Sequence, residues 1–239
     1  MSKKYANCAS QGVIDIACGA GRHAWVMASE FDWEVTGIDL SETLLNRASK
    51  GFQDNNINDP AIGLNDSTPV KIRDINNSPG FIRADMRQLP VESNLFGMAT
   101  NLFTSFGYFD SDDDNLCVLK EMARVLIPGG MLIFDHMNLA WTLDNLVEED
   151  TIYSEGIQVS QHRYFDKISR RLKKDISIKP VKGETRKVQE SVRIYKFEEM
   201  EQLLTSAGFK TELVVGDYTG ANYNPKTSKR MIICAKVEH

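Results

Sequence analysis

The stretch that decides the fold is Val13-Ile14-Asp15-Ile16-Ala17-Cys18-Gly19-Ala20-Gly21-Arg22-His23-Ala24, and Val35-Thr36-Gly37-Ile38-Asp39 follows it along the chain. The pattern is an apolar strand, a turn with two closely spaced glycines, a helix, and a second apolar strand that ends in an acid. Glycine lets the backbone approach a ligand closely, because it has no Cβ and tolerates positive φ. An acid at the tip of the second strand can accept hydrogen bonds from a pair of ribose hydroxyls. The two stretches together predict an adenosine-containing cofactor.

Strands and helices alternate through most of the remaining sequence. Strands are expected at residues 12–17, 34–38, 81–84, 98–102, 131–134, 210–215 and 229–237, and helices at 22–30, 41–50 and 197–207 and from the cap at 111 to the stop at 128. The continuous apolar run at 131–134 is typical of a strand in the middle of a parallel sheet that is covered on both faces. The pattern predicts an α/β fold with a doubly wound, mostly parallel seven-stranded-type sheet and helices on both faces.

The helical period disappears between residues 151 and 195. Three segments of strand-like composition, 156–165, 169–178 and 186–195, predict a three-stranded antiparallel insert. We therefore expect a single domain over residues 1–239, with a core at 12–143 and 197–239 and the β insert at about 147–196. A stretch rich in Asn, Asp, Pro and Ser between Gly51 and Gly80 predicts a long, mobile surface connection.

Composition excludes several classes of protein. The chain has 42% hydrophobic and 26% charged residues and no apolar run long enough for a membrane span, which predicts a soluble protein. Its first residues lack the apolar centre of a signal peptide, so a cytoplasmic location is expected. The four cysteines show no regular spacing, so we expect reduced thiols and no metal site.

Charge is distributed unevenly along the chain. Residues 163–196 contain 12 basic and 4 acidic residues, whereas the rest contains 16 basic and 29 acidic residues. Such asymmetry can indicate an anionic partner such as nucleic acid, although exposed lysines on strands are also a common protection against pairing of sheet edges.

Five motifs in a fixed order carry a family resemblance. They are Asp15-Ile16-Ala17-Cys18-Gly19-Ala20-Gly21-Arg22-His23, Gly37-Ile38-Asp39-Leu40-Ser41, Ala84-Asp85-Met86-Arg87-Gln88-Leu89-Pro90, Leu102-Phe103-Thr104-Ser105-Phe106-Gly107-Tyr108-Phe109 and Leu126-Ile127-Pro128-Gly129-Gly130. The chain resembles class I S-adenosylmethionine-dependent methyltransferases, most closely the small-molecule type with a β insert. The resemblance implies an enzyme that transfers a methyl group from S-adenosylmethionine to a nitrogen or oxygen nucleophile of a small molecule by in-line displacement.

The resemblance also implies which residues bind the cofactor. These are Asp15, Ala17, Cys18, Gly19, Gly21, Arg22, Asp39, Leu40, Asp85, Met86 and Leu102. Asp15 would hold the methionine amino group, the backbone from Ala17 to Gly21 would pass beneath the cofactor, and Asp39 would take the ribose hydroxyls. Asp85 and Met86 would flank the adenine, and the corner that contains Leu102 would border the methionine end.

Two residues are candidates for catalysis. Tyr108 follows the carboxyl end of a strand, where open α/β sheets bind ligands, and His136 follows the apolar strand at 131–134 at the same edge. Either could take a proton from the acceptor, although a lone histidine is more often a structural residue. The sulfonium is already activated, so positioning of the reactants is the main task and a strong base is optional.

The residues by themselves leave three other functions open. The basic insert suits an RNA methyltransferase, and the glycine pattern also satisfies the GxGxxA form of a nicotinamide cofactor site, which would make an NAD-dependent oxidoreductase. A non-catalytic S-adenosylmethionine-binding scaffold, with a homodimer formed through the insert, is the third alternative. Similar methyltransferases usually carry helices before the glycine strand that cover the active site. Since eleven residues precede residue 12, we expect the cover to come from elsewhere or the start to be truncated.

Overall fold

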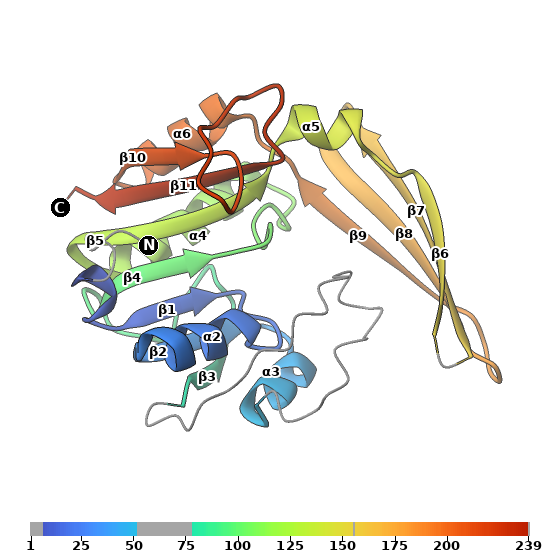
Figure 1. Cartoon of the computed structure of the whole chain (residues 1–239), viewed down its shortest axis with the longest axis horizontal. Coiled ribbons are helices and arrows are strands. Elements are labelled where there is room, and N and C mark those ends of the chain that lie inside the picture. Colours follow the sequence, from blue (N-terminus) through green and yellow to red (C-terminus); the bar gives the residue numbers. More distant parts are fainter. Residues whose placement is uncertain (1–6, 52–77, 155, 239) are drawn as a thin grey trace.

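A computed structural model describes residues 7–51, 78–154 and 156–238 of the chain. These residues form two sheets, one of seven strands and one of four (Figure 1). The prediction of a mobile connection between Gly51 and Gly80 falls on residues 52–77 and lies outside the described residues.

The seven-stranded sheet has the strand order β10-β11-β5-β4-β1-β2-β3. Its strands are β1 (Val13–Ile16), β2 (Val35–Asp39), β3 (Gly80–Arg83), β4 (Phe96–Asn101), β5 (Leu126–Met137), β10 (Phe209–Val215) and β11 (Arg230–Val237). The first five pair in parallel, and β11 and β10 are antiparallel additions at one side. The predicted doubly wound α/β fold is confirmed.

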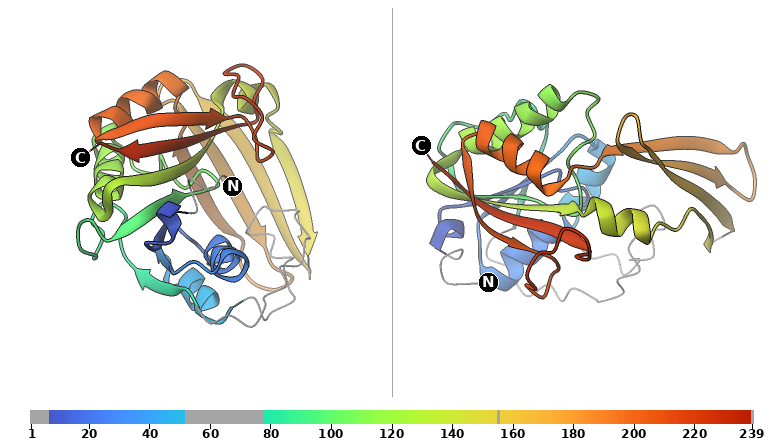
Figure 2. Two further views of the ribbon diagram at one scale, coloured as in Figure 1. Left: turned by 60° about the vertical axis from the view of Figure 1, so that its left-hand side comes forward. Right: turned by 90° about the horizontal axis from the view of Figure 1, so that it is seen from above.

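Helices cover both faces of this sheet. The helices of the described residues are α2 (Arg22–Phe31), α3 (Glu42–Ser49), α4 (Asp112–Val125), α5 (Leu139–Asp144) and α6 (Phe197–Ser206), of which α5 lies past the end of β5 and not on a face. Figures 1 and 2 show α2 on one face, with α4 and α6 on the other. The short helix α5 was not predicted, because six residues are too few to show a clear helical period.

Alternation along β1 explains why both faces are filled. All four residues of β1 are buried, and Val13 packs with α2 residues while Ile14 and Ile16 pack with α4 and α6 residues. Successive side chains of a strand point to opposite faces, so a strand that is apolar at every position suits a sheet covered on both sides. The two hydrophobic clusters hold the carboxyl ends of the parallel strands in one row.

The insert is a separate antiparallel sheet with the order β6-β7-β8-β9. Its strands are β6 (Glu149–Ser154), β7 (Ile157–Asp166), β8 (Arg171–Lys179) and β9 (Arg186–Arg193). The sequence predicted three strands, so that prediction was wrong by one, because β6 begins with two acids, Glu149 and Asp150, a residue type that is depleted in strands. An edge strand tolerates such charges, since its outer side faces solvent.

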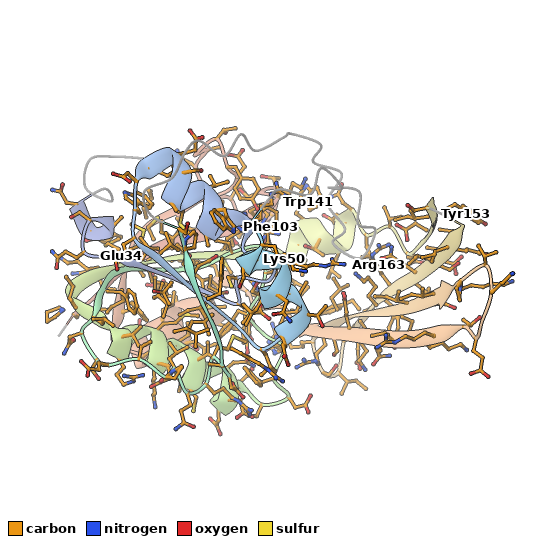
Figure 3. The ribbon with its side chains drawn as sticks, turned by 90° about the horizontal axis from the view of Figure 1, so that it is seen from below. Glu34, Lys50, Phe103, Trp141, Tyr153 and Arg163 are labelled. Carbon is orange, nitrogen blue, oxygen red and sulfur yellow. The ribbon has the colours of Figure 1, made fainter. Side chains whose placement is uncertain are left out.

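The four-stranded sheet stands beyond the side of the seven-stranded sheet at which its parallel strands end. The arrowheads of β1 and β4 point toward it in Figure 1, so the carboxyl ends of the parallel strands face the insert. Tyr153, labelled in Figure 3, lies at the end of the insert that is farthest from the core. None of the helices in the described ranges has the length and apolar composition needed to cross a membrane.

Candidate functional site

The turn after β1 has an open backbone surface at its first glycine. Ala17, Gly19 and Gly21 all have positive φ, of 60°, 56° and 75°. A Cβ on Gly19 would approach nothing closer than Leu44 Cδ1 at 4.0 Å, so the space beside it is free for a ligand. A Cβ on Gly21 would lie 2.7 Å from the Phe81 ring. Gly19 therefore leaves room for a bound molecule, whereas Gly21 allows α2 to pack closely on the sheet.

Asp39 ties this turn to the end of β2. Its Oδ2 accepts a hydrogen bond from the Gly19 N–H at 2.8 Å, and its Oδ1 accepts one from the Ser41 N–H at 2.8 Å. Each carboxylate oxygen can accept a second hydrogen bond, so Asp39 can still receive two hydroxyl donors. The neighbouring Leu40 is 64% exposed, which places an apolar side chain in the open next to this carboxylate.

Asp15, near the end of β1, is a buried acid with an unused oxygen. Its side chain is 2% exposed, and its Oδ1 accepts a hydrogen bond from Thr100 Oγ1 at 2.6 Å. Its Oδ2 has no hydrogen-bond partner in the described part of the chain. Burial raises the pKa of Asp15 to about 7, the Thr100 hydrogen bond acts in the opposite direction, and the charge of Asp39 raises it further. Such a carboxylate favours a cationic partner strongly, because a buried charge without one is costly.

Asp85 follows β3 at the same edge of the sheet. Arg87 donates to both of its carboxylate oxygens, with Nη2 to Oδ2 at 2.6 Å, and this pairing holds the pKa of Asp85 below its usual range. The Arg87 guanidinium lies 4.3 Å from the centre of the Phe109 ring. Met86 is half-buried against the core. The end of β3 therefore combines an oriented carboxylate with apolar surface.

The end of β4 is joined to β1 and then turns sharply. The Asn101 side chain donates from Nδ2 to the Ile16 carbonyl at 3.0 Å, which keeps the two strand ends together. Leu102 follows, and the next two residues, Phe103 and Thr104, both have left-handed backbone conformations with φ of 56° and 64°. The Asp135 carboxylate accepts a hydrogen bond from the Phe103 N–H at 3.0 Å.

Asp135 was missed by the sequence reasoning, as were its partners. Asp135 directly follows the apolar run at 131–134, and an acid at the end of such a strand could have identified it as a candidate site residue. Its other partners, Tyr218 and Arg230, come from the connection between β10 and β11 and from β11 itself. No local pattern links these residues to the end of β4.

Tyr108 lies on the loop after β4, half exposed, and burial of its hydroxyl raises the pKa of that group. The insert fixes this loop. Arg171 of β8 is buried and donates to the carbonyls of Gly107, Tyr108 and Phe109 at 2.9 to 3.1 Å. The Arg193 N–H donates to the Gly107 carbonyl at 2.8 Å. The position of Tyr108 therefore depends on the insert.

His136 lies within the core, away from the surface of the edge. It is completely buried, with the rings of Phe106, Phe134 and Tyr195 around it. Neither ring nitrogen has a hydrogen-bond partner among residues 7–51, 78–154 and 156–238, and burial lowers the pKa of His136 to about 3. A group that is neutral and enclosed in this way is not positioned to exchange a proton with a substrate, so we do not retain His136 as a catalytic candidate.

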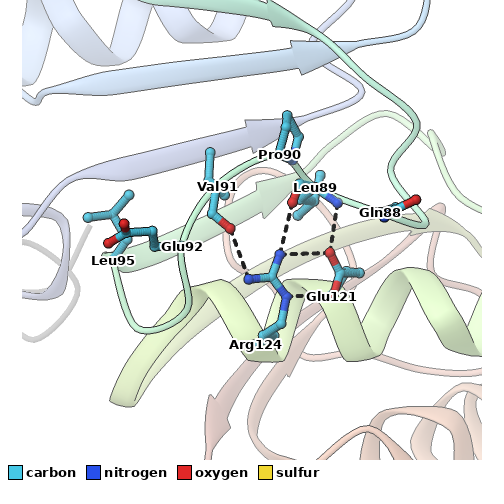
Figure 4. Close-up of a pocket in the computed structure, with 8 residues that line it drawn as sticks. All are labelled: Gln88, Leu89, Pro90, Val91, Glu92, Leu95, Glu121 and Arg124. Atoms are coloured by element: carbon cyan, nitrogen blue, oxygen red, sulfur yellow. Dashed lines mark hydrogen bonds and ion pairs between the residues drawn. The ribbon is translucent and has the colours of Figure 1, made fainter.

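A shallow pocket lies elsewhere on the same face of the fold as α4 (Figure 4). It has a volume of about 660 Å³ and is lined by the loop at 88–95 together with Glu121 and Arg124. Arg124 donates to the Leu89 and Val91 carbonyls at 3.0 and 2.9 Å and pairs with Glu121 at 2.6 Å. Its polar groups are thus occupied in holding the loop, and it lacks the glycine turn and the unpaired acid of the strand edge.

Comparison with known proteins supports a single family. The family model described as "Methyltransferase domain" matches residues 14–134. The "Putative methyltransferase YqeM" of Bacillus subtilis is 25% identical over 214 residues, which cover 87% of this chain and 76% of that protein. The dTDP-3-amino-3,4,6-trideoxy-alpha-D-glucopyranose N,N-dimethyltransferase of Streptomyces venezuelae is 23% identical over 217 residues, which cover 88% and 80%.

Solved structures show the same fold. An S-adenosylmethionine-dependent methyltransferase from Clostridium acetobutylicum has a TM-score of 0.73 at 19% identity and covers 99% of this chain and 92% of its own. The S-adenosylmethionine-bound CalS10, an amino pentose methyltransferase from Micromonospora echinaspora, has a TM-score of 0.61 at 18% identity and covers 98% and 88%.

Proposed function

Because this chain belongs to the methyltransferase-domain family and is an S-adenosylmethionine-dependent methyltransferase, we propose that its acceptor is an amine nitrogen of a small molecule. Family membership also decides between the two cofactors that the glycine pattern allows, in favour of S-adenosylmethionine over a nicotinamide. The finer proposal concerns the binding residues and the nucleophile.

The described edge fits the proposed cofactor in charge and shape. S-adenosylmethionine carries an ammonium group, a ribose and an adenine, and its positively charged sulfur supplies an activated methyl group. We assign the unpartnered Oδ2 of Asp15 to the ammonium, the open turn at Gly19 to the body of the cofactor, and Asp39 to the ribose hydroxyls. The exposed Leu40 and the half-buried Met86 offer apolar contact to a flat adenine, and Asp85 can accept from its amino group.

The observation that carries the proposal is the buried Asp15 carboxylate, which has one unpartnered oxygen beside an open glycine turn. Ala17, Cys18, Gly21, Arg22 and Leu102 form the turn, the start of α2 and the strand end around it, and they remain predicted contacts. With both ends of the cofactor held by fixed acids, the enzyme's own contribution is to orient the methyl carbon toward the acceptor and to keep water away.

The low basicity of His23 and Tyr108 at neutral pH supports nitrogen over oxygen. Burial lowers the pKa of His23 to about 4, and the pKa of Tyr108 is raised, so neither group is a strong base at neutral pH in its resting state. An alcohol needs a base to become a good nucleophile, whereas a neutral amine already has a reactive lone pair and can lose its proton afterwards. The relative from Streptomyces venezuelae is named for N,N-dimethylation of an amino sugar, which agrees with this choice.

The four-stranded sheet is the proposed platform for the acceptor. It stands opposite the carboxyl ends of the parallel strands, and Arg171 couples it to the loop that carries Tyr108 (Figure 1). We therefore propose that Tyr108 faces the acceptor. Assembly into a dimer through this sheet stays a prediction, which light scattering after size-exclusion chromatography tests.

RNA is a weaker candidate for the acceptor. Five of the basic residues in the 163–196 region form ion pairs inside the chain: Arg163, Arg170, Lys173, Lys174 and Arg193. The register of β7 and β8 also distributes basic side chains over both faces of the insert, because neighbouring residues of a strand alternate in direction. Phosphate binding needs unpaired cations on one surface, so this arrangement favours a small molecule.

The test is methyl transfer from S-adenosylmethionine labelled at its methyl group. The acceptor panel holds small amines, amino sugars, their hydroxyl counterparts and total RNA. Labelling of amines and not of hydroxyl counterparts supports the proposal. Labelling of hydroxyl compounds alone, or RNA labelling that falls steeply with salt, refutes it.

A further inference from the structure

Two consecutive residues at the end of β4 have a backbone conformation that non-glycine residues rarely adopt. Phe103 and Thr104 have φ of 56° and 64°. Each left-handed residue costs about 1 kcal/mol or more, so a pair persists only where surrounding contacts determine it. Those contacts come from a buried acid, Asp135, and from its partner Arg230.

Asp135 fixes both residues of the turn. It is 1% exposed, its Oδ2 accepts from the Phe103 N–H at 3.0 Å, and its carbonyl accepts from the Thr104 N–H at 2.9 Å. Arg230 donates from Nε to Asp135 Oδ1 at 2.7 Å and from Nη2 to Thr104 Oγ1 at 2.9 Å. The turn is therefore held through its backbone and through a side chain, by groups of β5 and β11.

The same acid fixes a stack of three rings. The Tyr218 hydroxyl donates to Asp135 Oδ2 at 2.9 Å, and its ring stacks on Phe103 with centres 5.7 Å apart. The His23 ring also stacks on Phe103, with ring centres 5.0 Å apart. We call these three rings the aromatic wall. His23 is in the first turn of α2, two residues beyond Gly21, so the wall begins next to the glycine turn that we assign to the cofactor.

The aromatic wall has exposed surface and no formal charge. Phe103 is 39% exposed, and Tyr218 is also exposed. The pKa of His23 is about 4, lowered by burial and by Arg22, so its ring is neutral at pH 7. The face of a neutral aromatic ring attracts cations through its quadrupole, and a protonated imidazole in the stack would oppose this attraction.

Methyl transfer changes the charge of the bound cofactor. The donor has a positive sulfonium, whereas the product S-adenosylhomocysteine has a neutral thioether at the same place. An aromatic face beside that sulfur would therefore stabilise the donor and not the product. This difference favours replacement of the spent product by fresh donor.

We propose that the aromatic wall of His23, Phe103 and Tyr218 recognises the sulfonium of S-adenosylmethionine, and that Asp135 is a positioning residue that holds the wall in place. The inference rests on the proposed cofactor site, and it adds a charge-selective contact that the fold by itself does not imply. Asp135 acts through Phe103 and does not touch the cofactor.

The test is a comparison of two dissociation constants, for S-adenosylmethionine and for S-adenosylhomocysteine, by isothermal titration calorimetry. In Phe103→Leu the affinity for S-adenosylmethionine falls about tenfold while that for S-adenosylhomocysteine changes less than twofold, because cation–π attraction acts on the sulfonium alone. Phe31→Leu is the matched control, since Phe31 is an exposed ring that stacks on Trp33 at the far end of α2. It leaves both affinities unchanged.

Equal loss of both affinities in Phe103→Leu overturns the inference, since that result indicates general damage to the site. No change in either affinity also overturns it, while leaving the proposed cofactor site intact. Binding of neither compound by the wild-type protein would instead refute the cofactor site itself.

The role of Asp135 is tested by a double-mutant cycle. If Asp135 acts through the wall, Asp135→Asn combined with Phe103→Leu gives the same ratio of the two dissociation constants as Phe103→Leu alone. Additive effects on that ratio would mean that Asp135 acts through its own charge, which refutes the positioning role. Thermal unfolding of each variant confirms that the compared proteins are folded.

Discussion

Replacing Asp15 with asparagine removes a buried negative charge while keeping the size of the side chain. In the wild type, Asp15 Oδ1 accepts from Thr100 Oγ1 at 2.6 Å, and Oδ2 has no partner among the described residues and is the atom that we assign to the cofactor ammonium. An asparagine retains an acceptor for Thr100, but it places a neutral amide at the proposed position of the ammonium. We predict weaker binding of S-adenosylmethionine and a changed response to pH.

The size of the effect follows from burial and charge. A hydrogen bond to a charged group contributes about 1.5 to 3 kcal/mol, so Asp15→Asn weakens binding by roughly ten- to a hundredfold at pH 7.5. The wild-type pKa of about 7 means that Asp15 must lose its proton before it can pair with the ammonium. Wild-type affinity therefore falls as the pH decreases, to about twentyfold weaker at pH 5.5 than at pH 7.5, and the asparagine variant lacks this dependence.

The assay is isothermal titration calorimetry with S-adenosylmethionine at several pH values between 5.5 and 7.5. At pH 7 the wild type releases about half a proton per cofactor bound, which is measured by repeating the titration in buffers of different ionisation enthalpy. Thr100→Val is the companion variant. It removes a hydrogen bond that lowers the pKa of Asp15, so the midpoint of the pH profile moves to higher pH.

Two results would refute this reasoning. The first is a pH dependence in Asp15→Asn equal to that of the wild type, which would assign the titration to another group. The second is full affinity in Asp15→Asn at pH 7.5, which would mean that the ammonium binds elsewhere.

The other predictions concern the second acid, the close-packed glycine, the buried histidine and the anchoring arginine. Asp39→Ala weakens S-adenosylmethionine binding at least tenfold, or about 1.4 kcal/mol, and equilibrium dialysis that finds unchanged affinity contradicts this. Gly21→Ala lowers the free energy of unfolding by roughly 2 to 4 kcal/mol in urea, because the added Cβ would lie 2.7 Å from the Phe81 ring at positive φ; a loss below 1 kcal/mol argues against the packing role. The pKa of His136 is lowered to about 3 in the folded protein, so the free energy of unfolding of the wild type falls as the pH decreases from about 6.5 toward 3, by up to about 1.4 kcal/mol per pH unit. His136→Phe lacks that part of the decline. If urea unfolding shows that both proteins lose the same free energy between pH 7 and pH 4.5, the prediction is disproved. Arg171→Met leaves three loop carbonyls without their donor, so methyl transfer falls while cofactor affinity is retained, and equal loss of both would contradict a role confined to the acceptor side.

The sequence was informative wherever a single segment contains the whole signal. The glycine turn, the acids near the ends of β1 and β2 and the cap at Ser41 could be predicted because each depends on neighbouring residues, and the Ser41 hydroxyl does accept the Leu44 N–H at 3.3 Å. Alternation of strands with helices was enough to predict the doubly wound sheet. These features follow from backbone conformation and hydrophobic periodicity, which are local properties.

The sequence could not give the environment of a side chain. His136 follows the apolar run at 131–134, as a residue of the strand edge would, yet it is enclosed by three rings from other segments. The role of Asp135 depends on Arg230 and Tyr218, which lie more than eighty residues further along the chain. Arg171 looked like one member of a basic stretch until the fold placed it against the loop that carries Tyr108.

The sequence by itself therefore determined the fold and the edge to which we assign the cofactor, because the chain repeats a local pattern whose strand ends must meet at one side of a parallel sheet. The tertiary structure alone decided which of the edge residues are exposed, which are neutral and which are held by distant partners. The physical reason is that burial, pKa and side-chain pairing depend on contacts between remote segments, and no local spacing of residues encodes those contacts.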